Sequence, residues 1–133
     1  MRESSARTSP NTRRAALVFL ERIVGSEKMP RSKVKITVLK RVDPSVIFDG
    51  DVPNVPGTDR KFEACTAFED GQEFVVENGE KPEGFCVWAW NDLFKSLSVL
   101  YFGGNFPWAE EGKMIACCTD GIRPVSFRLE RID

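Results

Sequence analysis

The chain of 133 residues has 41% hydrophobic and 29% charged residues and a formal net charge of −1, the ordinary balance of one soluble globular domain. It contains no histidine, which excludes Ser-His-Asp and Cys-His catalysis within one chain and removes the commonest metal ligand. No apolar run approaches the roughly 18 residues that a membrane span needs, so we expect no membrane span.

Positive and negative charges are unevenly distributed along the chain. Residues 1–33 carry eight Lys and Arg against three Glu, whereas residues 34–133 carry eleven Lys and Arg against seventeen Asp and Glu. Affinity for a phosphate backbone depends on clustered positive charge, and the patterns of RNP motifs and zinc fingers are missing from the sequence. We therefore expect no nucleic-acid partner.

The first thirty residues differ in composition from the rest. Residues 1–30 begin with a polar, basic segment rich in Ser and Thr, followed by a short apolar run, and are predicted to be a disordered or weakly helical, flexible extension. Met29 stands just before the first convincing strand, and our hypothesis is that it is the natural start. Residues 31–133 are predicted to form a single domain.

Alternating apolar and polar residues predict two strands in the first part of this domain. The run over residues 34–42 (VKITVLKRV) has the period of two of a half-buried strand. Residues 43–60 are rich in Pro, Gly and Asp, and are predicted to form a long loop. The second strand covers residues 72–77 (QEFVVE), with Phe74 and Val76 on one face.

One aromatic-rich stretch, residues 82–108, is predicted to contain the main helix. It holds all three tryptophans and the only tyrosine of the chain. Apolar residues recur at helical spacing and define one face: Trp90, Leu93, Phe94, Leu97, Leu100 and Tyr101. Gly103 is a helix stop. Asn91 and Asp92 either cap the helix or lie in its first turn, and a start near Phe85 fits equally well.

A hairpin over residues 114–132 is predicted to complete the domain. Asp120 and Gly121 give a strong turn signal between its two arms. Pro124 cannot donate to a ladder, so the second arm is either an edge strand there or begins its pairing beyond it. The order β-β-α-β-β predicts an α+β fold, with a small antiparallel sheet packed on one amphipathic helix.

Several segments resemble a small family of uncharacterised prokaryotic proteins. Members carry similar Gly-Gln-Glu-Phe, Pro-Glu-Gly-Phe-Cys-x-Trp-Ala-Trp and Cys-Cys-Thr-Asp-Gly-x-Arg-Pro-Val segments. The likeness covers roughly residues 33–132 through KVKITVLKR, FEDGQEFVVE, PEGFCVWAWNDL, FGGNFPW and MIACCTDGIRPVSFRLERI. This chain has Cys65-Thr66 where the family typically has Cys-Pro. The resemblance implies a family identity and no established activity.

The four cysteines are Cys65, Cys86, Cys117 and Cys118. None forms a Cys-x-x-Cys pair, yet thiolates from separate positions can bind zinc or an iron–sulfur cluster. Cys117 and Cys118 are adjacent on a strand and point to opposite faces, so they share a metal only if the backbone bulges. Small buried apolar cysteines are the leading interpretation, ahead of a metal site and of redox or nucleophilic use. Cys86, near a helix start, is the candidate nucleophile.

Ligand-binding candidates outside the cysteines are Trp88, Trp90, Trp108 and Arg123. The tryptophans could line a pocket for an apolar or planar ligand, or simply pack in the core. Arg123 could clamp a carboxylate or phosphate, although a solvated or salt-bridged arginine is the commoner outcome.

Together these patterns favour a non-catalytic binding or interaction module, with a small ligand, a protein or a second copy of the chain as partner. The alternative is a cysteine-dependent metal or redox protein that uses the four thiols. A third hypothesis is a histidine-free enzyme that uses Cys86 with a neighbouring carboxylate. The chain lacks a convincing signal peptide, and we expect a cytoplasmic location, where disulfides are rare.

Overall fold

A computed structural model describes residues 32–133, so the predicted extension over residues 1–30 and the hypothesis on Met29 lie outside the described residues. The described elements follow in chain order: β1 (Val34–Arg41), α2 (Pro44–Ile47), β2 (Glu73–Val76), α3 (Val87–Tyr101), β3 (Lys113–Cys117) and β4 (Val125–Arg131). The α+β fold predicted from the sequence is confirmed. No helix in residues 32–133 combines the length and the apolar character that crossing a membrane would take.

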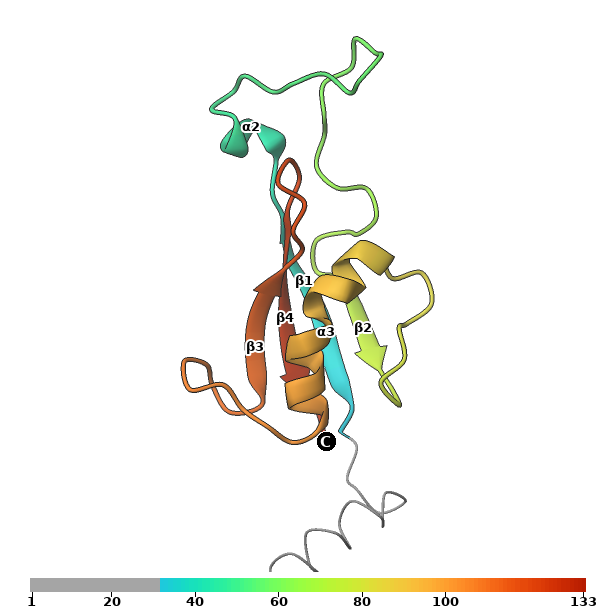
Figure 1. Cartoon of the computed structure of the whole chain (residues 1–133), viewed down its shortest axis with the longest axis vertical. Coiled ribbons are helices and arrows are strands. Elements are labelled where there is room, and N and C mark those ends of the chain that lie inside the picture. Colours follow the sequence, from blue (N-terminus) through green and yellow to red (C-terminus); the bar gives the residue numbers. More distant parts are fainter. Residues whose placement is uncertain (1–31) are drawn as a thin grey trace, which may run out of the picture. The chain divides into compact units, whose positions relative to one another are not determined.

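The four strands form one antiparallel sheet in the order β2-β1-β4-β3 (Figure 1). The first and last strands form its central pair, from Val34 opposite Arg131 to Arg41 opposite Val125, with a bulge between Val38 and Lys40. Since β4 begins at Val125, its ladder starts after Pro124, and the strand is central rather than at an edge. The second of the two alternatives for Pro124 is therefore confirmed.

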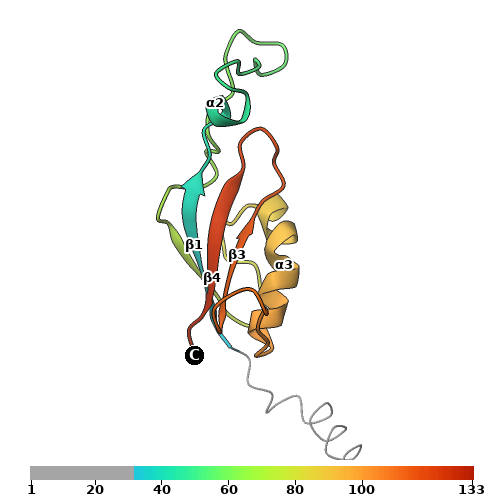
Figure 2. The same ribbon diagram turned by 90° about the vertical axis from the view of Figure 1, so that its left-hand side faces the viewer.

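Helix α3 covers one face of the sheet, and no other element of residues 32–133 covers the opposite face (Figure 2). The core lies between the helix and the sheet. Its largest fully buried side chains come from both layers: Phe127, Ile36, Leu93, Leu100, Leu129, Val34, Val38, Val76 and Val125. The predicted helix face is confirmed at Leu93, Leu97, Leu100 and Tyr101, but Phe94 is 51% exposed because it lies at the margin of the buried stripe.

The start of α3 differs from the first expectation. Cys86 is the N-cap, so Asn91 and Asp92 fall in the second turn and do not cap the helix. The carboxylate of Asp92 instead accepts hydrogen bonds from the backbone and hydroxyl of Thr119, at 2.8 and 3.0 Å. The Asp92 carboxylate, which the sequence suggested as a helix cap, therefore bonds to a residue outside the helix.

The last carbonyls of α3 are all satisfied, and the helix ends at the predicted glycine. Gly103, with φ of +85°, donates its N–H to the Leu100 carbonyl. Arg131, at the end of β4, adds a guanidinium: Nη1 donates to Leu100 at 3.1 Å and to Gly104 at 2.7 Å, and Nη2 donates to Asn105 Oδ1 at 2.9 Å. A cation at a helix C-terminus also suits the helix dipole.

The predicted loop over residues 43–60 contains the short helix α2. Asp43 caps it by accepting a hydrogen bond from the Ser45 backbone at 2.8 Å, and Pro44 occupies the first turn. Asp-Pro thus starts a helix here rather than only a turn. The loop extends beyond the ends of β1 and β4 before the chain returns to β2 (Figure 1).

Candidate functional site

The predicted ligand-binding residues do not meet at one place. Trp88 and Arg123 line one cleft, Trp90 lines a separate pocket, and Trp108, which is 73% exposed, borders a third hollow beside Lys113. Each tryptophan therefore belongs to its own hollow, and the three side chains do not form one binding wall.

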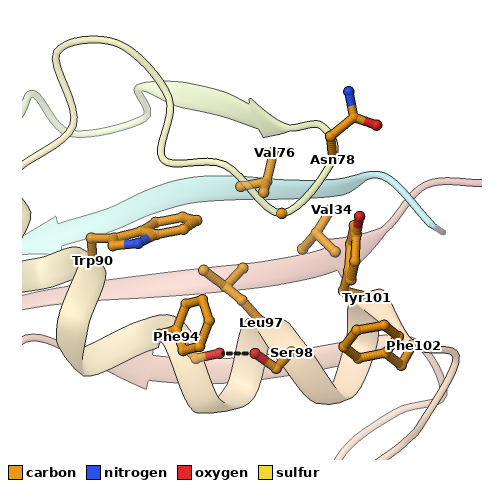
Figure 3. A pocket seen from close by; sticks show the side chains of 10 residues that line it. Val34, Val76, Asn78, Trp90, Phe94, Leu97, Ser98, Tyr101 and Phe102 are labelled. Atoms are coloured by element: carbon orange, nitrogen blue, oxygen red, sulfur yellow. Dashed lines mark hydrogen bonds between the residues drawn. The ribbon is translucent and has the colours of Figure 1, made fainter.

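The first site, here called the aromatic pocket, has a volume of about 270 Å³ and opens between α3 and the β1–β2 side of the sheet (Figure 3). Ten residues line it: Val34, Val76, Asn78, Gly79, Trp90, Phe94, Leu97, Ser98, Tyr101 and Phe102. Four aromatic rings of α3 and its cap form two pairs, one near each end. Trp90 and Phe94 have ring centroids 6.0 Å apart, and Tyr101 and Phe102 have centroids 5.0 Å apart.

Two of these rings face solvent to an unusual extent for phenylalanine. Phe94 is 51% exposed and Phe102 is 61% exposed, while Trp90 is only partly buried. The helical periodicity explains their spacing: residues 90, 94, 98 and 101 lie on the flank of α3 that faces β2. Val76 of β2 and the turn at Asn78 and Gly79 line the side of the pocket opposite this flank.

The lining of the aromatic pocket carries no charge at neutral pH, because none of its ten residues is Asp, Glu, Lys or Arg. Its polar side chains are few. The Ser98 hydroxyl donates to the Phe94 carbonyl at 2.7 Å, inside the helix. The Tyr101 hydroxyl is shielded from water and has no hydrogen-bond partner within residues 32–133. Pockets of this kind bind through apolar contact with a few oriented polar groups.

The second site, here called the thiol cleft, has a volume of about 580 Å³. Three segments that are far apart in the chain supply a cysteine each: the loop before β2 (Cys65), the N-cap of α3 (Cys86) and the residue after β3 (Cys118). Cys117 does not line it and is exposed, whereas Cys118 is buried, which agrees with alternation along a strand.

Backbone and side-chain hydrogen bonds hold the segments of the thiol cleft in place. Arg41 at the end of β1 donates to the Cys65 carbonyl at 3.1 Å and pairs with Asp70 at 3.2 Å. On the other wall, Trp88 Nε1 donates to the Thr119 hydroxyl at 3.1 Å, so the exposed indole is fixed against the hairpin. The cleft is therefore assembled from the sheet, the helix and the loop together.

Arg123 is engaged within the chain. Its Nε donates to Asp120 Oδ2 at 3.2 Å, and its guanidinium carbon lies 5.8 Å from the centroid of the Phe62 ring. Burial alone would raise the pKa of Asp120. Hydrogen bonds from the backbone N–H groups of Ile122 and Arg123, and the guanidinium itself, outweigh burial and hold that pKa below its usual range. The geometry agrees with the salt-bridged alternative for Arg123.

The cysteines do not form a metal centre in residues 32–133, where no group of three or more Cys, Asp or Glu is placed to hold a metal ion. Burial raises the pKa of the Cys118 thiol, and its sulfur accepts a hydrogen bond from the Val125 backbone at 3.2 Å. A protonated, buried thiol is a poor nucleophile. By their placement within residues 32–133, the thiols do not make up a ligand set for zinc or an iron–sulfur cluster.

The fold and the first of these hollows define a class: an α+β domain with one helix on an antiparallel sheet and an uncharged aromatic pocket at the helix flank. Comparison with known proteins adds no relative, since no family model, no curated protein and no solved structure matches this chain. The resemblance to uncharacterised prokaryotic proteins stays a prediction.

The sequence did not point to four residues that line the aromatic pocket beside Trp90: Phe94, Ser98, Tyr101 and Phe102. Phe94 and Tyr101 were assigned to the core stripe. One signal could have found them: the apolar stripe of α3 is wider than one helix face needs, and Phe102 continues it past the helix end.

Proposed function

We propose that the protein is a non-catalytic binding module whose aromatic pocket takes a small apolar ligand. The observation that carries the proposal is the uncharged lining combined with the half-exposed rings of Phe94 and Phe102. Covering about 40 Å² of such apolar surface contributes about 1 kcal/mol, at roughly 25 cal/mol per Å². A ligand in the pocket would remove apolar surface of both rings from water, and the free energy gained in this way drives binding.

The polar groups of the pocket support binding rather than chemistry. The Ser98 hydroxyl already donates within the helix, and no charged residue lies in the lining to act as its base. A ligand of about ten non-hydrogen atoms that gains about 0.4 to 0.7 kcal/mol per atom binds with about 4 to 7 kcal/mol, which corresponds to a Kd of about 10 μM to 1 mM. The module is therefore expected to bind small ligands reversibly.

The three tryptophans make the test direct, because each reports a different hollow. In an amide-proton NMR spectrum of the whole chain, the three indole N–H signals are assigned with single Trp→Phe variants. We expect neutral bicyclic aromatic compounds to shift the signal of Trp90 and to leave those of Trp88 and Trp108 in place. No shift of the Trp90 signal at millimolar ligand would refute the proposal.

A matched pair of variants on α3 separates pocket binding from general effects. Phe94→Ala removes one wall of the pocket and should weaken binding about tenfold or more, because it deletes a large apolar contact. Val87→Ala changes a residue that is 61% exposed on the same helix and lies outside the pocket, and should bind as the wild type does. Equal affinities of the two variants would contradict the assignment of the site.

A cysteine-dependent redox role is the second candidate, favoured by the convergence of Cys65, Cys86 and Cys118 on one cleft. With a small-molecule disulfide as oxidant, two protein thiols would form one S–S bond and lose two protons and two electrons, while the reagent is reduced to two thiols. Mass spectrometry should then find a disulfide that includes Cys65 and that Cys65→Ser abolishes. Mixed disulfide at Cys117 alone would refute this role.

We also propose a cytoplasmic location, supported by four cysteines that are all free thiols in the structure. A second copy of the chain is the alternative partner for the exposed aromatic rings, and dilution during the NMR experiment tests it. Indole signals that shift with protein concentration, without any ligand, would favour self-association.

A further inference from the structure

We infer that the ligand of the aromatic pocket is an uncharged molecule of bicyclic size that presents a carbonyl or similar acceptor at the Trp90 end of the pocket, and that the indole N–H of Trp90 donates the hydrogen bond that orients it. The inference rests on the proposed function and adds the chemical class of the ligand. Its three parts are the unpartnered indole N–H, the uncharged lining and the volume of the pocket.

The indole N–H of Trp90 is accessible to water and has no acceptor within residues 32–133. Trp90 lines the aromatic pocket and is only partly buried. Two buried side-chain polar atoms of the described residues lack a hydrogen-bond partner, Thr37 Oγ1 and the Tyr101 hydroxyl. Trp90 Nε1 is not one of them although it donates to no group in this part of the chain, so it retains surface that a water molecule or a ligand atom can reach.

The nitrogen of this indole lies on the side of the ring that faces α3. Figure 3 shows it on the edge of the indole toward Phe94, while Val76 of β2 lies beyond the opposite edge. The rings of Trp90 and Phe94 have centroids 6.0 Å apart and both line the pocket. A ligand that packs against both rings therefore displaces the water at the Trp90 N–H.

The loss of that water favours a ligand with an acceptor. A donor that is covered without a partner loses its hydration, whereas a carbonyl oxygen restores the hydrogen bond. The other polar side chains of the lining do not supply an equivalent donor. The Ser98 hydroxyl already donates to the Phe94 carbonyl, and the Tyr101 hydroxyl is shielded. Asn78 is exposed, and its amide points away from the pocket (Figure 3).

The charge of the ligand follows from the lining. A carboxylate or an ammonium group in this pocket would lose its hydration without meeting an opposite charge, because none of the ten lining residues is Asp, Glu, Lys or Arg. A neutral acceptor such as a ketone or an aldehyde loses far less and is matched by one neutral donor. Charged ligands are therefore disfavoured relative to neutral ones.

The size of the ligand follows from the volume. An apolar cavity of about 150 Å³ holds one benzene molecule. The aromatic pocket, at about 270 Å³, has room for about two fused rings. The ring system of the ligand extends from the Trp90–Phe94 pair toward the Tyr101–Phe102 pair, and its acceptor lies at the Trp90 end.

The test compares indane with 1-indanone, which share a skeleton and differ in one carbonyl, on the wild-type chain and on Trp90→Phe. Binding is followed by the NMR signals of the two compounds, because the variant lacks the indole signal. We expect the preference for 1-indanone over indane to fall by about 2- to 12-fold in Trp90→Phe, the range that one net hydrogen bond supports.

Trp88→Phe is the matched control. Trp88 lies on the same helix, but it lines the thiol cleft and its N–H is taken by the Thr119 hydroxyl at 3.1 Å. We expect this variant to keep the wild-type preference for 1-indanone. A preference that falls equally in both variants would overturn the role of the Trp90 N–H.

The remaining outcomes separate the two claims. If neither compound binds the wild type or shifts its Trp90 signal, the proposed function fails. If both compounds bind and the preference in Trp90→Phe equals that of the wild type, the ligand site stands and the role of the Trp90 N–H is overturned.

A readout on the wild type alone covers the case in which Trp90→Phe does not fold or binds neither compound. We expect intermolecular nuclear Overhauser effects from the Trp90 indole N–H proton to the C2 and C7 protons of bound 1-indanone, which flank its carbonyl. Contacts from that proton to the C4 and C5 protons instead would place the carbonyl away from Trp90, and would overturn the inference.

Discussion

Replacing Arg131 by methionine should destabilise the domain far more than its place at the end of β4 suggests. Its guanidinium donates to the carbonyls of Leu100 and Gly104, both partly buried, and to Asn105 Oδ1. Charge-assisted hydrogen bonds contribute about 1.5–3 kcal/mol each when they are not replaced by water. Methionine keeps the apolar stem but loses every donor, so we expect a loss of about 2–4 kcal/mol in the free energy of unfolding.

Urea unfolding followed by the helix signal in circular dichroism measures this loss, and Arg128→Met is the matched control. Arg128 lies three residues earlier on β4, and within residues 32–133 its one ion pair is with Glu130, at 2.8 Å, with its side chain 42% exposed. Exposed pairs of this kind contribute about 0–1 kcal/mol. If Arg131→Met loses no more stability than Arg128→Met, the capping role assigned to Arg131 is wrong.

Two further predictions concern the hairpin between β3 and β4. The lowered pKa of Asp120 means that its ionised form stabilises the fold above its ordinary value of 3.8, and that this contribution is lost as the pH falls through the lower folded value. Asp120→Asn should therefore cost about 1 kcal/mol in urea unfolding at pH 7, and progressively less as the pH is lowered below 3.8; a cost that does not fall with pH would exclude the charge as the cause. A maleimide should modify the exposed Cys117 rapidly and the buried Cys118 only as the domain opens, and equal rates by peptide mass spectrometry would contradict the burial of Cys118.

The fold could be predicted from local patterns, because apolar residues recur with a clear period both in the strands of the sheet and in the helix. The alternation over residues 34–42 locates β1, and the recurrence of Leu93, Leu97 and Leu100 locates α3. The Asp120–Gly121 turn separates β3 from β4, although its residues make an Asx-type turn in which Asp120 also pairs with Arg123. Each of these signals depends on residues that are close together in the sequence, so each can be recognised before the structure is known.

The sites could not be predicted to the same extent as the fold. Each site is formed by residues that are far apart in the sequence and meet only in the folded chain. Trp88, Trp90 and Trp108 lie within one short stretch of the sequence. In the structure each lines a different hollow, so their proximity in the chain does not bring them together in one pocket. Asp92 is a residue type that commonly caps helices, but here its carboxylate accepts a hydrogen bond from the backbone of Thr119, after β3. The aromatic pocket also needs Val34, Val76, Asn78 and Gly79 from outside α3, which no helical period reveals.

The central pairing of β1 with β4 has a consequence for how the chain folds. Val34 and Arg131 face each other although about 100 positions separate them. Helix α3 and the β3–β4 hairpin involve near neighbours and can form early, whereas β1 has no central partner until Val125–Arg131 is present. Closing so long a loop costs entropy before the contacts offset it, which places folding in the slower range of small domains. During synthesis, β2 can pair with one edge of β1, but the other edge of β1 stays without a partner until β4, the last strand of the sheet, has been made.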